Sequence, residues 1–293
     1  MDFISPTDGP YVLYQGKKWL DFSSCDFLGL SQHPEVRKAA IKYVLKYGAG
    51  VPASPLGSSV QQQFEGKLAH YLGTEIALLF PCMESVHQIV SGCKGTIISS
   101  DHEMPKLKKS LTPLCLDESF TIGITGHQGF GIAANKSDYD LIAGSLANGI
   151  GCAGAFIAGS KKHLSQIPSS HPLSYAVLGA LDTALSFVPE MTQERETIAK
   201  HLRWFVKQFE DLSFINHKSP RLFLQFKSGI EAEKTRLLFA EEQIYLAPSV
   251  DHQLYIAFTA LHTPDDLDQL ATALKKFAAT ELALSMQSLT PTP

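Results

Sequence analysis

The sequence has little of what marks secreted, membrane-spanning or nucleic-acid-binding chains. Its five cysteines include no Cys-x-x-Cys pair, and their odd number gives no disulfide framework, so we expect a reduced, cytoplasmic chain. The first residues lack a basic segment followed by an apolar run, and no apolar stretch is long enough to span a bilayer. These absences predict neither a signal peptide nor a membrane segment. The net charge of −4 gives no basic surface for nucleic acid.

The residues that are present predict an α/β fold. The 293 residues are enough for one large or two ordinary domains. Continuous apolar runs favour strands that are covered on both faces of a mostly parallel sheet. The runs begin at Ile76, Thr96, Leu114, Asp140 and Ala155.

Helical spacing of apolar residues predicts helices between and after these strands. The expected helices cover about 34–48, 60–72, 173–187, 191–210, 230–240 and 264–279, with strands at 221–226 and 253–259. From this pattern we expect four parts: an N-terminal arm and helix (1–45), a large α/β domain (46–190), a smaller C-terminal α+β domain (191–284) and a disordered tail (285–293).

Several short motifs occur in the order known from one enzyme family. Asp26-Phe-Leu-Gly-Leu-Ser and His33-Pro-Glu-Val are followed by Tyr47-Gly-Ala-Gly, Asp117-Glu118 and Gly144-Ser145-Leu146. Each motif is weak alone, but their order along nearly the whole chain resembles the α-oxoamine synthases, which include 8-amino-7-oxononanoate synthase. The resemblance implies a type I aminotransferase fold, a homodimer and an acyltransferase dependent on pyridoxal phosphate.

The family's chemistry requires a lysine that forms a Schiff base with the cofactor. In the motif that should carry it, Asn148 stands at the lysine position, and an amide cannot form an imine. Phe120 and Pro105 stand at the positions of two histidines that contact the cofactor ring. Tyr255 replaces the arginine that binds the substrate carboxylate. Pro55 aligns with a further arginine. We therefore assign no catalytic residue.

Two residues at family cofactor positions remain. Asp117 corresponds to the partner of the pyridine nitrogen, and Ser145 could receive the phosphate, whereas Met83 replaces a glycine and would obstruct it. For Asp117 we favour the other interpretation, an aspartate that ends a buried strand and bonds to the next turn, whereas Ser145 equally suits a turn or a helix cap. Lys136, Lys161 and Lys162 lie outside the lysine motif and suit solvent-exposed positions. We expect no covalently bound cofactor and no metal.

The chain is also shorter than the family pattern inside its large domain. Only Lys106 to Cys115 separate the segment that contains Pro105 from the strand that ends at Asp117, where the family has several strands and helices. The remaining elements must close over this gap or be covered by another chain, because exposed sheet edges favour association.

Three functions remain open on the sequence alone. The first is a non-catalytic partner or regulator, which pairs with itself or with an active paralogue. The second is an enzyme, either an acyltransferase that acts on an amino acid and an acyl-CoA, or one with altered activity. Such an enzyme would hold the cofactor non-covalently or use different chemistry in the cleft, where Asp117, Glu118, His87, His102 and Cys152 are the available polar groups. Their spacing forms no recognised metal or nucleophile set. The third is a decaying gene product.

Overall fold

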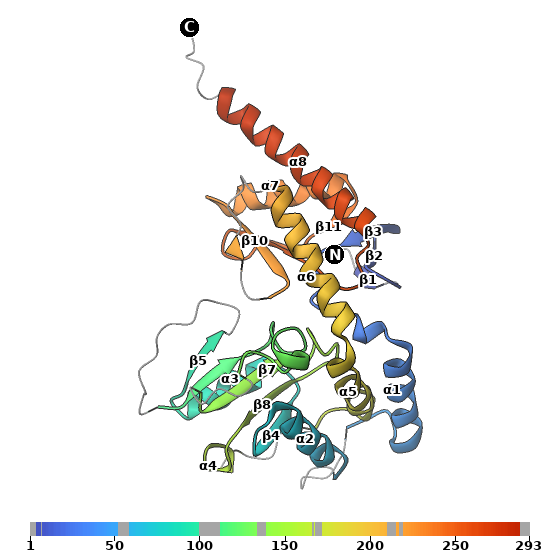
Figure 1. The fold of residues 1–293 in the computed structure, drawn as a ribbon, viewed down its shortest axis with the longest axis vertical. Coiled ribbons are helices and arrows are strands. Elements are labelled where there is room, and N and C mark those ends of the chain that lie inside the picture. The colour runs from blue at the N-terminus through green and yellow to red at the C-terminus, as the bar shows by residue number, and fades with distance from the viewer. Residues whose placement is uncertain are drawn as a thin grey trace. The chain divides into compact units, whose positions relative to one another are not determined.

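The computed structural model describes residues 4–6, 8–51, 59–99, 112–133, 139–165, 167, 172–209, 215–216 and 219–287. Internal contacts divide the chain into two units (Figure 1). The large unit contains residues 25–196 and 217–219, and the small unit combines 1–24, 197–216 and 220–293. Our expected boundaries differ, because they set 1–45 apart as an arm. A long-range strand pairing joins the first residues to the C-terminal part, and local sequence patterns do not reveal such a pairing.

A five-stranded sheet forms the centre of the large unit, and all five expected strands are present. In spatial order they are β4 (Ile76–Phe80), β8 (Ala155–Gly159), β7 (Leu141–Ser145), β6 (Leu114–Asp117) and β5 (Thr96–Ser99). β5, β6 and β7 are parallel, whereas β8 is antiparallel to both of its neighbours. Four strands therefore run in one direction and one runs against them, which confirms the mostly parallel α/β class.

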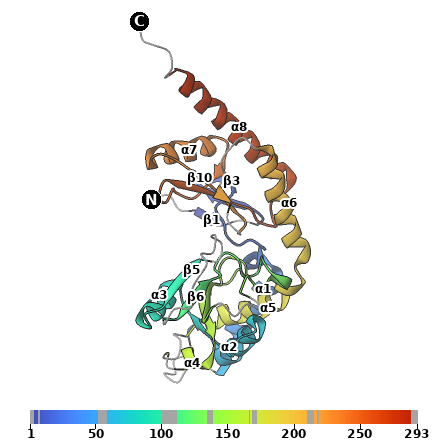
Figure 2. The same cartoon turned by 60° about the vertical axis from the view of Figure 1, so that its left-hand side comes forward.

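Helices cover this sheet because its strands are apolar on both faces. Val86 and Val90 pack with Cys115, Leu141 and Ile157 in a buried cluster on one face. α2 packs against β4, and α1 packs against α5 (Figure 2). The helices are α1 (Pro34–Tyr47), α2 (Ser59–Leu72), α3 (Met83–Gly92), α4 (Lys161–Leu164) and α5 (Tyr175–Phe187), with 3-10 turns at Leu30–Gln32, His127–Gly129 and Val188–Glu190.

The contact between α1 and α5 shows how local sequence sets the packing. α1 begins at Pro34, where the side chain of His33 accepts a hydrogen bond from the Glu35 amide at 3.3 Å. A Cβ atom at Gly179 on α5 would lie 2.6 Å from the Ala39 carbonyl oxygen. Glycine at this position therefore allows the two helices to approach closely.

The sheet is continuous across the shortened segment. β5 pairs directly with β6 in parallel, from Thr96 opposite Leu114 to Ser99 opposite Asp117. The connecting residues 100–111 lie outside the described part of the chain. Of the two outcomes that the sequence left open for this gap, the strand pairing therefore supports closure of the sheet within one chain.

The described residues of the small unit form two sheets and three helices. One sheet has the order β1 (Ile4–Pro6), β2 (Tyr11–Tyr14), β3 (Lys17–Asp21) and β11 (Ile244–Tyr245). The other has the order β12 (Gln253–Ala257), β10 (Arg221–Gln225) and β9 (Ile215–Asn216). The helices are α6 (Thr192–Gln208), which begins in the large unit, α7 (Gly229–Glu241) and α8 (Pro264–Gln287). Phe258 contacts both Phe22 and Phe205 in the core, with ring centroids 5.9 and 5.3 Å apart.

The final helix is longer than expected. α8 extends to Gln287, so residues 285–287 of the expected disordered tail are helical, and 288–293 lie outside the described residues. The stretch from Ala278 to Leu284 consists mostly of strong helix formers, which favours this extension. Within the described residues, no helix combines the length and hydrophobicity that crossing a membrane requires.

Candidate functional site

Two parallel strands bring the retained family residues to one edge of the large-unit sheet. β6 ends at Asp117 and β7 ends at Ser145, and the register places Asp117 opposite Ala143. In parallel α/β sheets ligands bind beyond the carboxyl ends of the strands. The turns that follow Asp117 and Ser145 therefore form the edge at which the resemblance places a cofactor. We call residues 117–121 and 145–150 the strand-end turns.

Ser119 joins the two strand-end turns. Its amide donates a hydrogen bond to Asp117 Oδ1 at 2.8 Å, and its hydroxyl oxygen accepts one from the Ser145 amide at 2.9 Å. Its carbonyl oxygen accepts a third bond from Asn148 Nδ2 at 2.7 Å. Ser119 is buried and its three bonds are partly buried, so together they hold the two turns in one arrangement.

Asn148 therefore performs a local structural task at the position of the family's lysine. Only the nitrogen of its amide can donate, and this nitrogen is bonded to Ser119. The hydroxyl oxygen of Ser145 accepts the Ala147 amide at 3.2 Å, as expected for a turn residue. Asp117 and Ser145 thus both contribute to bonds within the strand-end turns.

Glu118, within the first of these turns, is buried in the protein interior. Its Oε1 atom accepts a hydrogen bond from the Ala133 amide at 2.5 Å, and its Oε2 atom accepts one from the Thr121 hydroxyl. Only 1% of Glu118 is exposed, so the carboxylate anchors the following glycine-rich turn to the sheet. Phe120, at a histidine position of the family, is half-buried and has no group that could exchange a proton.

The other candidate residues have no common location. Met83 begins α3 and packs against the buried cluster beneath it, whereas His87 is exposed on the same helix. Lys161 and Lys162 are exposed at the start of α4. Cys152 is 3% exposed, and burial, with a smaller effect of the Asp26 carboxylate, raises the pKa of its thiol to about 12. A thiol with this pKa is a poor nucleophile at neutral pH.

Tyr255 lies in the small unit, on β12. Its hydroxyl donates a hydrogen bond to the Ser23 carbonyl at 2.9 Å, so it joins β12 to the segment after β3. Pro55, His102, Pro105 and Lys136 lie outside the described residues, and the expectations for them remain predictions. Among the residues that the structure does describe, no group of three or more histidine, cysteine or acidic side chains could hold a metal ion.

The sequence interpretation missed the central role of Ser119. The signal was present, because Asp117-Glu118-Ser119-Phe120 departs from the Asp-Glu-Ala-His pattern at its third residue as well as its fourth. Serine adds a hydroxyl that can both donate and accept. The motif therefore gains a hydroxyl at Ser119 besides losing a histidine at Phe120.

Sequence comparisons relate this chain to one family of known proteins. A family model described as aminotransferase class I and II matches residues 95–274. An 8-amino-7-oxononanoate synthase of Gluconacetobacter diazotrophicus is 26% identical over 67% of this chain and 70% of its own. One from a Polaromonas species is 25% identical over 94% and 91%. The latter alignment spans 369 positions, more than the 293 residues of this chain, so segments of the relative have no counterpart here.

Solved structures show the same fold. A serine palmitoyltransferase from Sphingomonas wittichii has a TM-score of 0.76 at 14% identity, over 94% of this chain and 91% of its own. An 8-amino-7-oxononanoate synthase from Francisella tularensis has a TM-score of 0.75 at 17% identity, over 90% and 99%. Identities this low establish the similarity of fold alone.

Proposed function

Because the chain belongs to the aminotransferase class I and II family, we propose that it is a non-catalytic homologue of the 8-amino-7-oxononanoate synthases that acts as a protein partner. One observation carries the proposal. Asn148 occupies the position of the lysine, and its amide is bonded to the Ser119 carbonyl at 2.7 Å. The side chain that should react with a cofactor instead stabilises a turn.

The residues at the strand-end turns do not fit covalently held pyridoxal phosphate. A Schiff base requires a primary amine, and Ser119, Ser145 and Asn148 offer hydroxyl and amide groups only. The half-buried side chain of Met83 stands at the start of α3, where the family has a glycine that allows close approach of a phosphate. We therefore derive no reaction step through this cofactor.

The preserved core supports a role that depends on the fold. The middle of the central sheet remains apolar, and Leu116, Ala143, Phe156 and Ile157 are completely buried. A chain that has lost its reactive groups but keeps such a core can still present surfaces to another protein. We propose a second copy of this chain or a catalytically active relative as the partner.

The loss of chemistry is tested with the wild-type protein and the Asn148→Lys variant. Each is incubated with pyridoxal phosphate, followed by its visible spectrum, and then assayed for acyl transfer from an acyl-CoA to alanine. We expect no turnover from either protein, because Phe120 and Tyr255 remain at the histidine and arginine positions. Turnover by the wild type would refute the proposal, and turnover by the variant would show that one side chain accounts for the loss.

The partner is tested separately, by light scattering on the purified chain alone and mixed with a lysine-containing relative from the same organism. A stable dimer or a mixed complex at micromolar concentration supports the proposal. A monomer under both conditions contradicts the proposed partner role and leaves the result on chemistry unaffected.

A further inference from the structure

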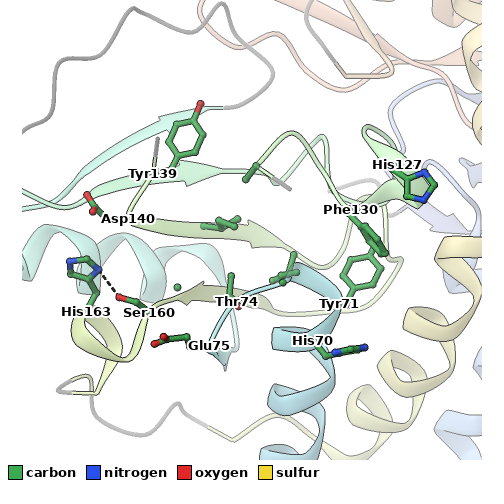
Figure 3. Close-up of a pocket in the computed structure, with 15 residues that line it drawn as sticks. His70, Tyr71, Thr74, Glu75, His127, Phe130, Tyr139, Asp140, Ser160 and His163 are labelled. Atoms are coloured by element: carbon green, nitrogen blue, oxygen red, sulfur yellow. Dashed lines mark hydrogen bonds between the residues drawn. The ribbon is translucent and has the colours of Figure 1, made fainter. Parts of the chain in front are cut away.

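A cavity of about 680 Å³ opens in the large unit, and one of its lining residues, Ala133, donates its amide to Glu118 of the strand-end turns. Most of it lies where β4 and β7 begin and β8 ends (Figure 3). Asp117 and Ser145 are the last residues of β6 and β7. Its volume falls within the range of about 300–1,000 Å³ that is usual for small-molecule sites. The end of α2, the turn His127–Phe130, the start of β7 and the segment after β8 all contribute to its lining.

Two carboxylates line one end of the cavity. Glu75 precedes β4 and Asp140 precedes β7, with Ser160 and His163 beside them (Figure 3). Glu75 Oε2 accepts the Lys161 amide at 2.7 Å, and Asp140 Oδ2 accepts the Leu114 amide at 2.9 Å. Each carboxylate is thus held in place through one oxygen. The second oxygen of each has no hydrogen-bond partner among the described residues and is available to a ligand.

Aromatic rings line the other end. The rings of Tyr71 and Phe130 meet edge to face, with centroids 4.8 Å apart (Figure 3). The centroid of the His127 ring lies 6.3 Å from that of Phe130. The Tyr71 hydroxyl donates to the Gly129 carbonyl at 2.8 Å, which fixes the tyrosine against the turn that carries both other rings. Such a preformed group of rings favours a flat apolar body, by edge-to-face or offset contact.

The charge of the lining selects the ligand class. The described residues that line the cavity include two acids and no lysine or arginine. Apart from His70, His127 and His163, these described lining residues offer an anion two carboxylates and no cationic side chain, whereas an amine would gain charge-assisted hydrogen bonds. We propose that this cavity binds a small organic amine, with its ammonium group at Glu75 and Asp140 and its flat apolar body at Phe130 and Tyr71.

Tryptamine is a suitable probe because it joins an ammonium group to a flat ring, and indole-3-propionate is its anionic counterpart. Calorimetric titration of the full chain is expected to show saturable binding of tryptamine and at least tenfold weaker binding of indole-3-propionate. Equal affinity for the two compounds would overturn the proposal, since it would show that charge plays no part. Absence of tryptamine binding at millimolar concentration would overturn it as well.

The site is located with Glu75→Gln and Asp140→Asn, each of which keeps an oxygen that can accept the same backbone amide. Each variant is expected to weaken tryptamine binding at least fivefold and to leave the circular dichroism spectrum unchanged. Glu84→Gln is the matched control, because Glu84 is exposed on α3 and does not line the cavity. Unchanged affinity in both cavity variants would refute the assignment. This inference does not depend on the proposed function, because the assay requires neither pyridoxal phosphate nor a partner.

Discussion

Asn148 connects the proposed loss of covalent chemistry with the stability of the strand-end turns. Replacing it with alanine removes the bond to the Ser119 carbonyl, and we expect the free energy of unfolding to fall by about 1 kcal/mol. Asn148→Asp should be more destabilising at neutral pH, because it places a carboxylate oxygen against that carbonyl and adds a negative charge near Asp117. Urea denaturation of the three proteins measures both effects. Equal stability of wild type and Asn148→Ala would mean that this hydrogen bond makes no net contribution to the free energy of unfolding.

His262 gives the small unit a defined response to pH. It is 3% exposed and stacks on Phe22 with ring centroids 4.1 Å apart. Its Nδ1 atom accepts the Thr259 amide at 3.0 Å, which leaves the proton on Nε2, facing the Asp21 carbonyl. Burial lowers the pKa of His262 to about 4. A proton added at Nδ1 would also oppose the Thr259 N–H group.

The sign of the pH effect follows from this lowered pKa. The unfolded chain binds a proton at His262 below about pH 6.5, whereas the folded chain does not until about pH 4. The free energy of unfolding should therefore fall as the pH drops from 6.5 to 4, by on the order of 3 kcal/mol from this residue. Burial lowers the pKa of His201 too and acts in the same direction, whereas the raised pKa of Asp21 acts in the opposite one.

His262→Asn isolates the contribution of this residue, because its side-chain oxygen can still accept the Thr259 amide and the group does not titrate. The difference in unfolding free energy between wild type and variant should shrink as the pH falls from 7 towards 4. Asp21 and His201 are present in both proteins, so their effects largely cancel. A difference that stays constant across this interval would show that His262 titrates normally in the folded protein.

Gly149, in a strand-end turn, and Gly66, in α2, differ in whether their surroundings leave space for a side chain. A Cβ atom at Gly149 would collide with the Ile122 carbonyl oxygen, whereas one at Gly66, on the exposed face of α2, meets no atom within 4 Å. We expect Gly149→Ala to destabilise the protein by about 2–3 kcal/mol through overpacking. Gly66→Ala should stabilise it by about 0.5–1 kcal/mol, because alanine favours a helix interior. Thermal unfolding of both variants measures the contrast, and similar shifts would contradict it.

Sequence patterns predict where the helices and strands lie better than they predict which elements contact one another. The runs at Ile76 and Ala155 and the helix after Pro34 appear where expected, because apolar periodicity and helix-start residues act locally. The reversed direction of β8 was not predicted, since a continuous apolar run carries no information about orientation. The role of Ser119 was also missed, because its partners are separated from it in sequence by 26 and 29 residues.

At the scale of the whole molecule, the division into units depends on contacts distant in sequence. β3 pairs in parallel with β11, Leu20 opposite Ile244, and this joins the first 24 residues to the C-terminal part. The sequence of neither strand indicates that it pairs with the other. The candidate site was more predictable, because the order of the motifs assigns Asp117, Ser145 and Asn148 to one cofactor site. The hydrogen bonds that join the turns could be found only from the structure. The cavity at Glu75 and Asp140 carried no motif and required the structure.

The most direct test of the account is reductive trapping on the intact chain. The protein is incubated with a small excess of pyridoxal phosphate, reduced with borohydride, and examined by intact mass and peptide mapping. We predict no stoichiometric phosphopyridoxyl adduct, because the strand-end turns present an amide where a primary amine is required. One adduct per chain at a single lysine would contradict the central claim that this member of the family has lost its covalent chemistry.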